Sequence, residues 1–144
     1  MRVVALTFHD IAGDGAETGP QPEGFSRITA EELEQVLLPL RHRGYQTVSS
    51  RAFRAWQGGS KALPEHALVL TFDHGYASHF GVATSLLLRH HFTGTFFVTV
   101  ERIGRPGYMT WEQLRKLVFL GMEIGSHGLS PEPLTRLSRP QLDE

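Results

Sequence analysis

The sequence has no cysteine, little net charge and no long apolar run, and each absence excludes a class of site or partner. Without cysteine there are no disulfides and no thiolate zinc site, so any metal must be held by histidine, aspartate, glutamate or water. A formal net charge of −1 gives no reason to expect nucleic acid or an anionic membrane as a partner. No stretch approaches the roughly 20 apolar residues of a membrane-spanning helix.

The beginning of the chain carries no recognisable export signal. Residues 1–10 lack the long apolar core and the small-residue cleavage site of a signal peptide. The sequence as given therefore predicts a cytoplasmic protein, or an exported one if a leader has been removed. Its 144 residues suffice for one domain with its own core.

The most informative stretch is an apolar, β-branched run over residues 68–72 that ends in an acid, a histidine and a glycine at 73–75. This pattern predicts a strand that delivers two polar side chains at its carboxyl end, followed by a tight exit at glycine. Residues 125–128 (GSHG) end another short apolar run in the same way. Because ligands and catalysis lie at that edge of α/β sheets, the two strand ends predict a shared site built around a metal.

Strand and helix patterns alternate along the chain. We expect about five strands, over residues 2–8, 46–48, 67–72, 94–100 and 122–126. Two of the helical patterns between them begin with a capping box, at Thr29 with Glu32 and at Thr110 with Gln113. The βαβα order predicts a parallel sheet, because parallel neighbours need crossover connections.

The length of the chain leaves two α/β architectures open, a doubly wound sheet or part of a β/α barrel. A barrel typically needs roughly 250 residues. Residues 138–141 resemble a helix start, with serine as the cap and proline in the first turn, yet the sequence ends at Glu144. We therefore favour the front portion of a barrel, as a single domain over residues 1–144 that is truncated at its carboxyl end.

Several motifs together resemble the polysaccharide deacetylase family, or NodB-homology domain. They occur in the family's order and spacing, over residues 71–76 (TFDHGY), 95–98 (TFFV), 110–114 (TWEQL) and 121–127 (GMEIGSH). Residues 8–11 (FHDI) are similar to the opening strand of many members. The resemblance runs from Arg2 to Ser138, which is almost the whole chain.

The resemblance implies an incomplete distorted (β/α) barrel of parallel β/α units and a divalent metal, in this family often zinc. It implies a hydrolase that cleaves the amide bond, a carbon–nitrogen bond other than a peptide bond, of N-acetylated sugars in a carbohydrate polymer or oligomer. In the family's T-F-D-D-G pattern the first acid is the catalytic base, which corresponds to Asp73. The first histidine of the family's H-x-x-x-H motif binds the metal and corresponds to His127.

Two positions depart from the family's pattern. His74 replaces the metal-binding aspartate, and Pro131, which has no donor atom, replaces the second histidine four residues after His127. The expected metal ligands are therefore His74 and His127, with His9 at the end of the first strand as a third, and such a site holds its metal weakly. Tyr76, which follows the motif glycine, is expected to border the site and contact substrate.

Other residues with chemical potential receive a structural interpretation. Trp111, at a predicted helix start, is expected to pack rather than to line a sugar groove. The remaining histidines lie in predicted helices or loops and are expected to be solvated; they are His42, His66, His79, His90 and His91.

Three functional hypotheses remain open. The first is a metal-dependent deacetylase of N-acetylated carbohydrate, whose activity in this chain is weakened by the altered ligand positions. The second is a non-catalytic relative that keeps the fold and a carbohydrate-binding groove. The third is a fragment whose exposed strand edges pair with another chain, which predicts a homo-oligomer.

Overall fold

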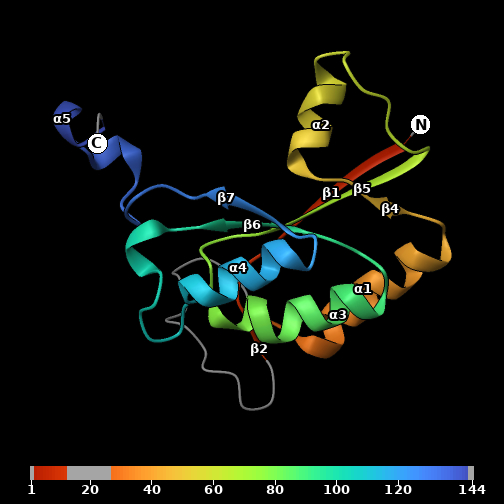
Figure 1. Cartoon of the computed structure of the whole chain (residues 1–144), viewed down its shortest axis with the longest axis horizontal. Helices are drawn as coiled ribbons and strands as arrows, with labels where there is room; N and C mark the ends of the chain where they lie inside the picture. Colours follow the sequence, from red (N-terminus) through yellow and green to blue (C-terminus); the bar gives the residue numbers. More distant parts are fainter. Residues whose placement is uncertain (1, 13–26, 143–144) are drawn as a thin grey trace.

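The computed structural model describes residues 2–12 and 27–142, and its centre is a parallel five-stranded sheet (Figure 1). The strands are β1 (Arg2–Phe8), β4 (Gln46–Thr47), β5 (His66–Phe72), β6 (Thr95–Val98) and β7 (Glu123–Ser126). They follow the order β1-β5-β6-β7. Both β4 and β6 pair with the same side of β5: β4 lies near the beginning of β5, and β6 lies along the last two residues of β5. The strands and the parallel sheet predicted from the sequence are therefore confirmed.

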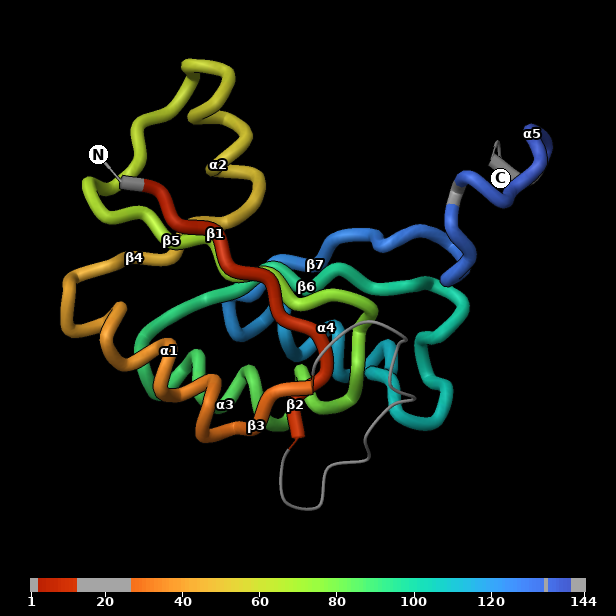
Figure 2. Tube along the Cα trace, turned by 180° about the vertical axis from the view of Figure 1, so that it is seen from behind, coloured from red at the N-terminus to blue at the C-terminus, as the bar shows by residue number. Residues whose placement is uncertain are grey.

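The helices lie on both sides of this sheet. They are α1 (Ala30–His42), α2 (Ser50–Gln57), α3 (Thr84–Arg89), α4 (Trp111–Phe119) and α5 (Arg139–Leu142). Three of them, α1, α3 and α4, gather on one side, whereas α2 stands on the other side near β1 and β5 (Figure 1, Figure 2). Both predicted capping boxes are present, at the starts of α1 and α4.

Shorter elements complete the fold. A small parallel pair joins β2 (Ile11–Ala12) to β3 (Ile28–Thr29). Three short helical turns are η1 (His79–Ala83), which is a π-helical turn, η2 (Val100–Arg102) and η3 (Leu134–Arg136). Within the described part of the chain, the helices are all too short or too polar to cross a membrane.

The core lies between the sheet and its helices. Phe72 and Phe96 stack on neighbouring strands with their ring centroids 4.9 Å apart, and both are fully buried. Leu33 and Leu37 of α1 and Leu87 of α3 are fully buried in the same cluster. Burial of each such side chain stabilises the fold by about 1.5–3 kcal/mol. This packing supports the sheet whose carboxyl edge carries the candidate site.

The far edge of the sheet, at β7, carries exposed apolar side chains. The prediction that Trp111 packs is wrong, because its side chain is 57% exposed. Phe119, at the other end of α4, is 91% exposed. Among the described residues the sheet runs from β1 to β7 without closing into a barrel. Beside the β7 edge, α4 therefore leaves apolar surface exposed.

Candidate active site

Three strand ends place polar side chains at one edge of the sheet. His9 follows β1, Asp73 follows β5 and His127 follows β7. Backbone bonds continue the ladder beyond the strands: the Asp73 N–H donates to Phe8 O over 2.9 Å, and the His127 N–H donates to Val98 O over 2.8 Å. Because parallel strands all point the same way, these three residues share the carboxyl edge, where ligands bind in α/β folds.

The side chains at this edge converge. Nε2 of His127 lies 3.8 Å from Oδ2 of Asp73. The ring centroids of His74 and His127 are 4.5 Å apart, and those of His9 and His74 are 5.4 Å apart. Four predicted site residues therefore form one group, with the His74 ring within about 5.5 Å of both other imidazoles.

The backbone after β5 turns through the left-handed region, which positions His74. His74 has φ +73° and Gly75 has φ +81°. Histidine, like aspartate and asparagine, is enriched among the few residues that adopt this conformation. At Gly75 a Cβ atom would lie 3.0 Å from Cγ1 of Val98, so a larger residue would also collide with β6. This turn explains the glycine of the motif and directs residue 74 to the site.

Burial and neighbouring charges shift the acid–base properties of the group. The pKa of Asp73 is raised by partial burial, which outweighs the opposing effect of His127 and His9. The pKa of His74 is lowered to about 4 by burial and by repulsion from His127, His9 and Arg102. Near neutral pH His74 is therefore a neutral imidazole, which is the form that binds metals. A raised pKa also makes Asp73 a stronger base.

The described residues fall short of a complete metal site. Within residues 2–12 and 27–142 no group of three or more histidine, aspartate or glutamate side chains has the geometry to hold a metal ion. His74 and His127 are the closest pair of imidazoles, whereas catalytic zinc takes three protein ligands. The arrangement therefore does not fit a tightly held zinc ion, and the ligand roles of His74, His127 and His9 stay predictions.

Tyr76 lies behind the site rather than in its opening. Its side chain is fully buried, its ring meets the edge of His74 at 5.7 Å, and it stacks on Tyr108 at 5.2 Å. Burial raises the pKa of the Tyr76 hydroxyl. Tyr76 thus supports the His74 ring, and its contact with substrate stays a prediction.

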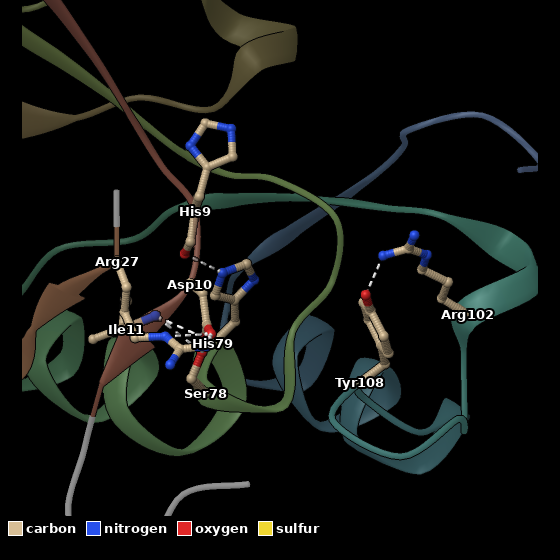
Figure 3. Close-up of polar contacts among 8 residues, drawn as sticks. All are labelled: His9, Asp10, Ile11, Arg27, Ser78, His79, Arg102 and Tyr108. Carbon is tan, nitrogen blue, oxygen red and sulfur yellow. Dashed lines mark hydrogen bonds and ion pairs between the residues drawn. The ribbon is translucent and has the colours of Figure 1, made fainter. Parts of the chain in front are cut away.

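A buried acid beside His9 was not identified from the sequence. Asp10 is 2% exposed, and Arg27 donates to its Oδ2 from Nε over 2.8 Å and from Nη2 over 2.5 Å (Figure 3). Its Oδ1 accepts from the Ser78 hydroxyl over 2.8 Å and from the Ile11 N–H over 2.9 Å. A charge this buried persists only when it is paired and hydrogen-bonded. The available signal was an acid directly after a predicted strand, in the FHDI stretch.

Two histidines contradict the expectation of solvation. His79 is fully buried and its Nε2 lies 2.7 Å from His9 O, as Figure 3 shows. His90 is also buried, and its Nε2 lies 3.0 Å from Oε1 of Glu34 on α1. The prediction failed because helical position alone does not reveal which face a later strand or helix covers.

The sequence of this chain is similar to that of known deacetylases. A family model described as polysaccharide deacetylase matches residues 60–144, which is more than half of the chain. Over 140 residues the chain is 29% identical to the poly-β-1,6-N-acetyl-D-glucosamine N-deacetylase of Escherichia coli (strain K12); the match covers 86% of this chain and 20% of that protein. The chain therefore spans about a fifth of the length of this relative.

Solved structures give the same result for the fold. A de-N-acetylase from Aggregatibacter actinomycetemcomitans is 26% identical with a TM-score of 0.72, over 87% of this chain and 54% of that one. The deacetylase PplD of Streptococcus pyogenes, solved in complex with acetate, is 21% identical with a TM-score of 0.78, over 96% of this chain and 61% of that one. The parallel β/α arrangement, as part of a barrel, is therefore the fold of these deacetylases.

Proposed function

This chain belongs to the polysaccharide deacetylase family, and on that premise we propose that it hydrolyses the acetamide group of an N-acetylated carbohydrate. The observation that carries the proposal is the Asp73 carboxylate, 3.8 Å from the His127 imidazole at the carboxyl edge of the sheet. A base beside an imidazole at this edge suits hydrolysis of an amide by water. The family membership supports the substrate class, and the closeness of the two side chains supports Asp73 as a base beside an imidazole.

The chemistry assigned to Asp73 is removal of a proton from the attacking water. The water oxygen bonds to the acetyl carbon, the carbon–nitrogen bond breaks, and acetate and a free amine leave. The raised pKa of Asp73 favours this proton transfer, and its side chain is 20% exposed and so accessible to water. The leaving amine needs a proton in return, and we assign its donation to His9, whose imidazole lies at the same edge with its ring centroid 5.4 Å from that of His74.

The proposed cofactor is a divalent metal, with zinc as the first candidate, held weakly by His74 and His127. When bound, such an ion supplies polarisation of the acetyl carbonyl and acidifies a bound water. The pair leaves at least one protein ligand missing. We therefore expect slow turnover and easy loss of metal in this chain.

The proposed substrate is a polymer or oligomer of N-acetylated sugars. The Escherichia coli relative is named for poly-β-1,6-N-acetyl-D-glucosamine, which supports an N-acetylhexosamine unit. A formal net charge of −1 suits a neutral polymer better than a polyanion.

Acetate release from N-acetylglucosamine oligomers by the intact chain, with zinc added, tests this function. Asp73→Asn keeps the shape of the side chain but removes the base, so we expect release to fall by about 10²–10⁴-fold. Glu65→Gln, at an exposed acid just before β5, is the matched control and should retain activity. Equal activity of Asp73→Asn and the unchanged chain would contradict the proposed role of Asp73.

A second proposal concerns assembly and rests on the uncovered edge at β7. A groove of about 580 Å³ opens between α4 and the last two strands, lined by Trp111, Leu114, Val118 and Ile124 among others. Monomers rarely leave large apolar patches in water. We therefore propose that a second copy of the chain covers this edge. Light scattering after size exclusion should give a dimer mass that Phe119→Glu reduces to the monomer mass, and a monomer of the unchanged chain at high concentration would contradict this.

A further inference from the structure

We propose that His79 is a positioning residue of the candidate site, because its side chain holds the backbone of His9 in place. The inference rests on the proposed function only in counting His9 among the site residues. His79 begins the π-helical turn η1, a few residues after the motif strand β5, and it reaches across to the end of β1. Turns of this wide type occur often at functional sites.

The contact itself is a single, partly buried hydrogen bond. Nε2 of His79 lies 2.7 Å from the carbonyl oxygen of His9, and the ring points at that oxygen in Figure 3. The His79 side chain is 0% exposed, so its end of the bond is shielded from water. Loss of the His79 donor would remove this restraint on the His9 carbonyl.

Aromatic side chains fix the orientation of the His79 ring. Phe72 meets it edge-on at 5.5 Å, Tyr76 at 5.6 Å in a nearly perpendicular arrangement, and Phe96 at 6.0 Å. Perpendicular contacts of this kind are preferred over face-to-face stacking. The ring therefore has little freedom to turn away from the His9 carbonyl.

The protonation state suits a donor role. Burial lowers the pKa of His79 to about 4, so the imidazole is neutral near neutral pH. A neutral imidazole carries one N–H, and a carbonyl can only accept, which assigns the proton to Nε2. Nδ1 has no hydrogen-bond partner among the described residues. The ring thus makes its one donor bond to the backbone of the site.

Ser78, next to His79, holds the two residues that follow His9. Its hydroxyl donates to Oδ1 of Asp10 over 2.8 Å and accepts from the Ile11 N–H over 3.3 Å. On the other side of His9, the Phe8 carbonyl accepts from the Asp73 N–H. The backbone of His9 is therefore held from both directions by the segment that carries the catalytic base, and this fixes the His9 imidazole relative to His74.

Variants of His79 separate positioning from general packing. Glutamine can place an amide N–H close to where Nε2 lies, whereas asparagine is too short to reach the His9 carbonyl. We expect His79→Asn to move the His9 imidazole resonances in nitrogen–proton NMR spectra and to lower kcat by up to about 10²-fold, the cost of a misplacement near 1 Å. His79→Gln should leave both the His9 resonances and kcat close to those of the unchanged chain. Leu87→Ala, a core change in the following helix without contact to His9, should lower stability alone.

The outcomes are distinct. Unchanged His9 resonances in His79→Asn, or an equal displacement in Leu87→Ala, would overturn the proposal. If both His79 variants fail to fold, Ser78→Ala, which removes the neighbouring contact with little loss of volume, should move the same resonances, and no movement would overturn the proposal. Because the NMR readout needs no turnover, an inactive but well-folded chain would count against the proposed function and leave this inference standing.

Discussion

The two sides of the candidate site are held to different degrees. On the β1–β5 side, Asp10 is almost fully buried and bonded to Arg27, Ser78 and the Ile11 N–H. On the β7 side, the His127 side chain is 38% exposed and stands beside an open apolar groove. The β1–β5 side is therefore fixed by the chain's own core, whereas the position of His127 depends on what covers β7.

Removal of the Asp10 carboxylate should strongly destabilise the β1–β5 side of the site. Asp10→Ala leaves the Arg27 guanidinium without its carboxylate and the Ser78 hydroxyl without its acceptor, so we expect a loss of about 3 kcal/mol of unfolding free energy. Urea denaturation measures this. Glu112→Gln, which breaks the solvent-exposed pair with Lys116 on α4, should lower the unfolding free energy far less. Equal losses in the two variants would show that the Asp10 cluster is not structural.

Acidic pH should also lower the stability of the β1–β5 side, because it protonates the buried His79. The pKa of His79 in the folded chain is about 4, below the ordinary value of 6.5, so the unfolded chain binds more protons in between. Stability is therefore fully present above pH 6.5 and is lost as pH falls toward 4, by at most on the order of 3 kcal/mol. Denaturation curves at several pH values measure it. His79→Gln should flatten the dependence, and a flat curve for the unchanged chain would contradict the assignment.

The β7 side of the site should bind zinc more tightly once the family's metal ligands are restored. His74→Asp combined with Pro131→His recreates the family's ligand pattern, so we expect zinc to bind at least about tenfold more tightly, or 1.4 kcal/mol. Isothermal titration calorimetry measures the affinity. His42→Asp, at an exposed position at the end of α1, is the control and should change nothing. Unchanged affinity in the double variant would contradict the proposed ligands.

Much of the fold could be predicted from the sequence because its signals are local. The apolar run before Asp73 and the capping boxes at Thr29 and Thr110 each involve only a few consecutive residues. The resemblance in the motifs also singled out Asp73 and His127, which the structure brings within 3.8 Å of each other. Each of these predictions needed only short-range patterns and the rule that parallel strands share a carboxyl edge.

The supports of the site could not be predicted because they join distant parts of the chain. His79 contacts His9 across 70 residues, and Asp10 receives Arg27 across 17. Nothing in the helical pattern around His79 distinguishes a buried imidazole from a solvated one. The prediction that Trp111 packs failed for the opposite reason. The apolar pattern around Trp111 predicts burial, but the described residues leave this side of α4 uncovered.

The pKa of Asp73, followed by carbon NMR of its carboxyl group, tests most directly whether the two sides meet in one site. Burial should hold this pKa above the ordinary value of 3.8, and the positive charge of His127 opposes that rise. His127→Gln should therefore raise the pKa of Asp73 further, while His42→Gln should leave it unchanged. A value at or below 3.8 that does not respond to His127→Gln would contradict the convergence of these two residues.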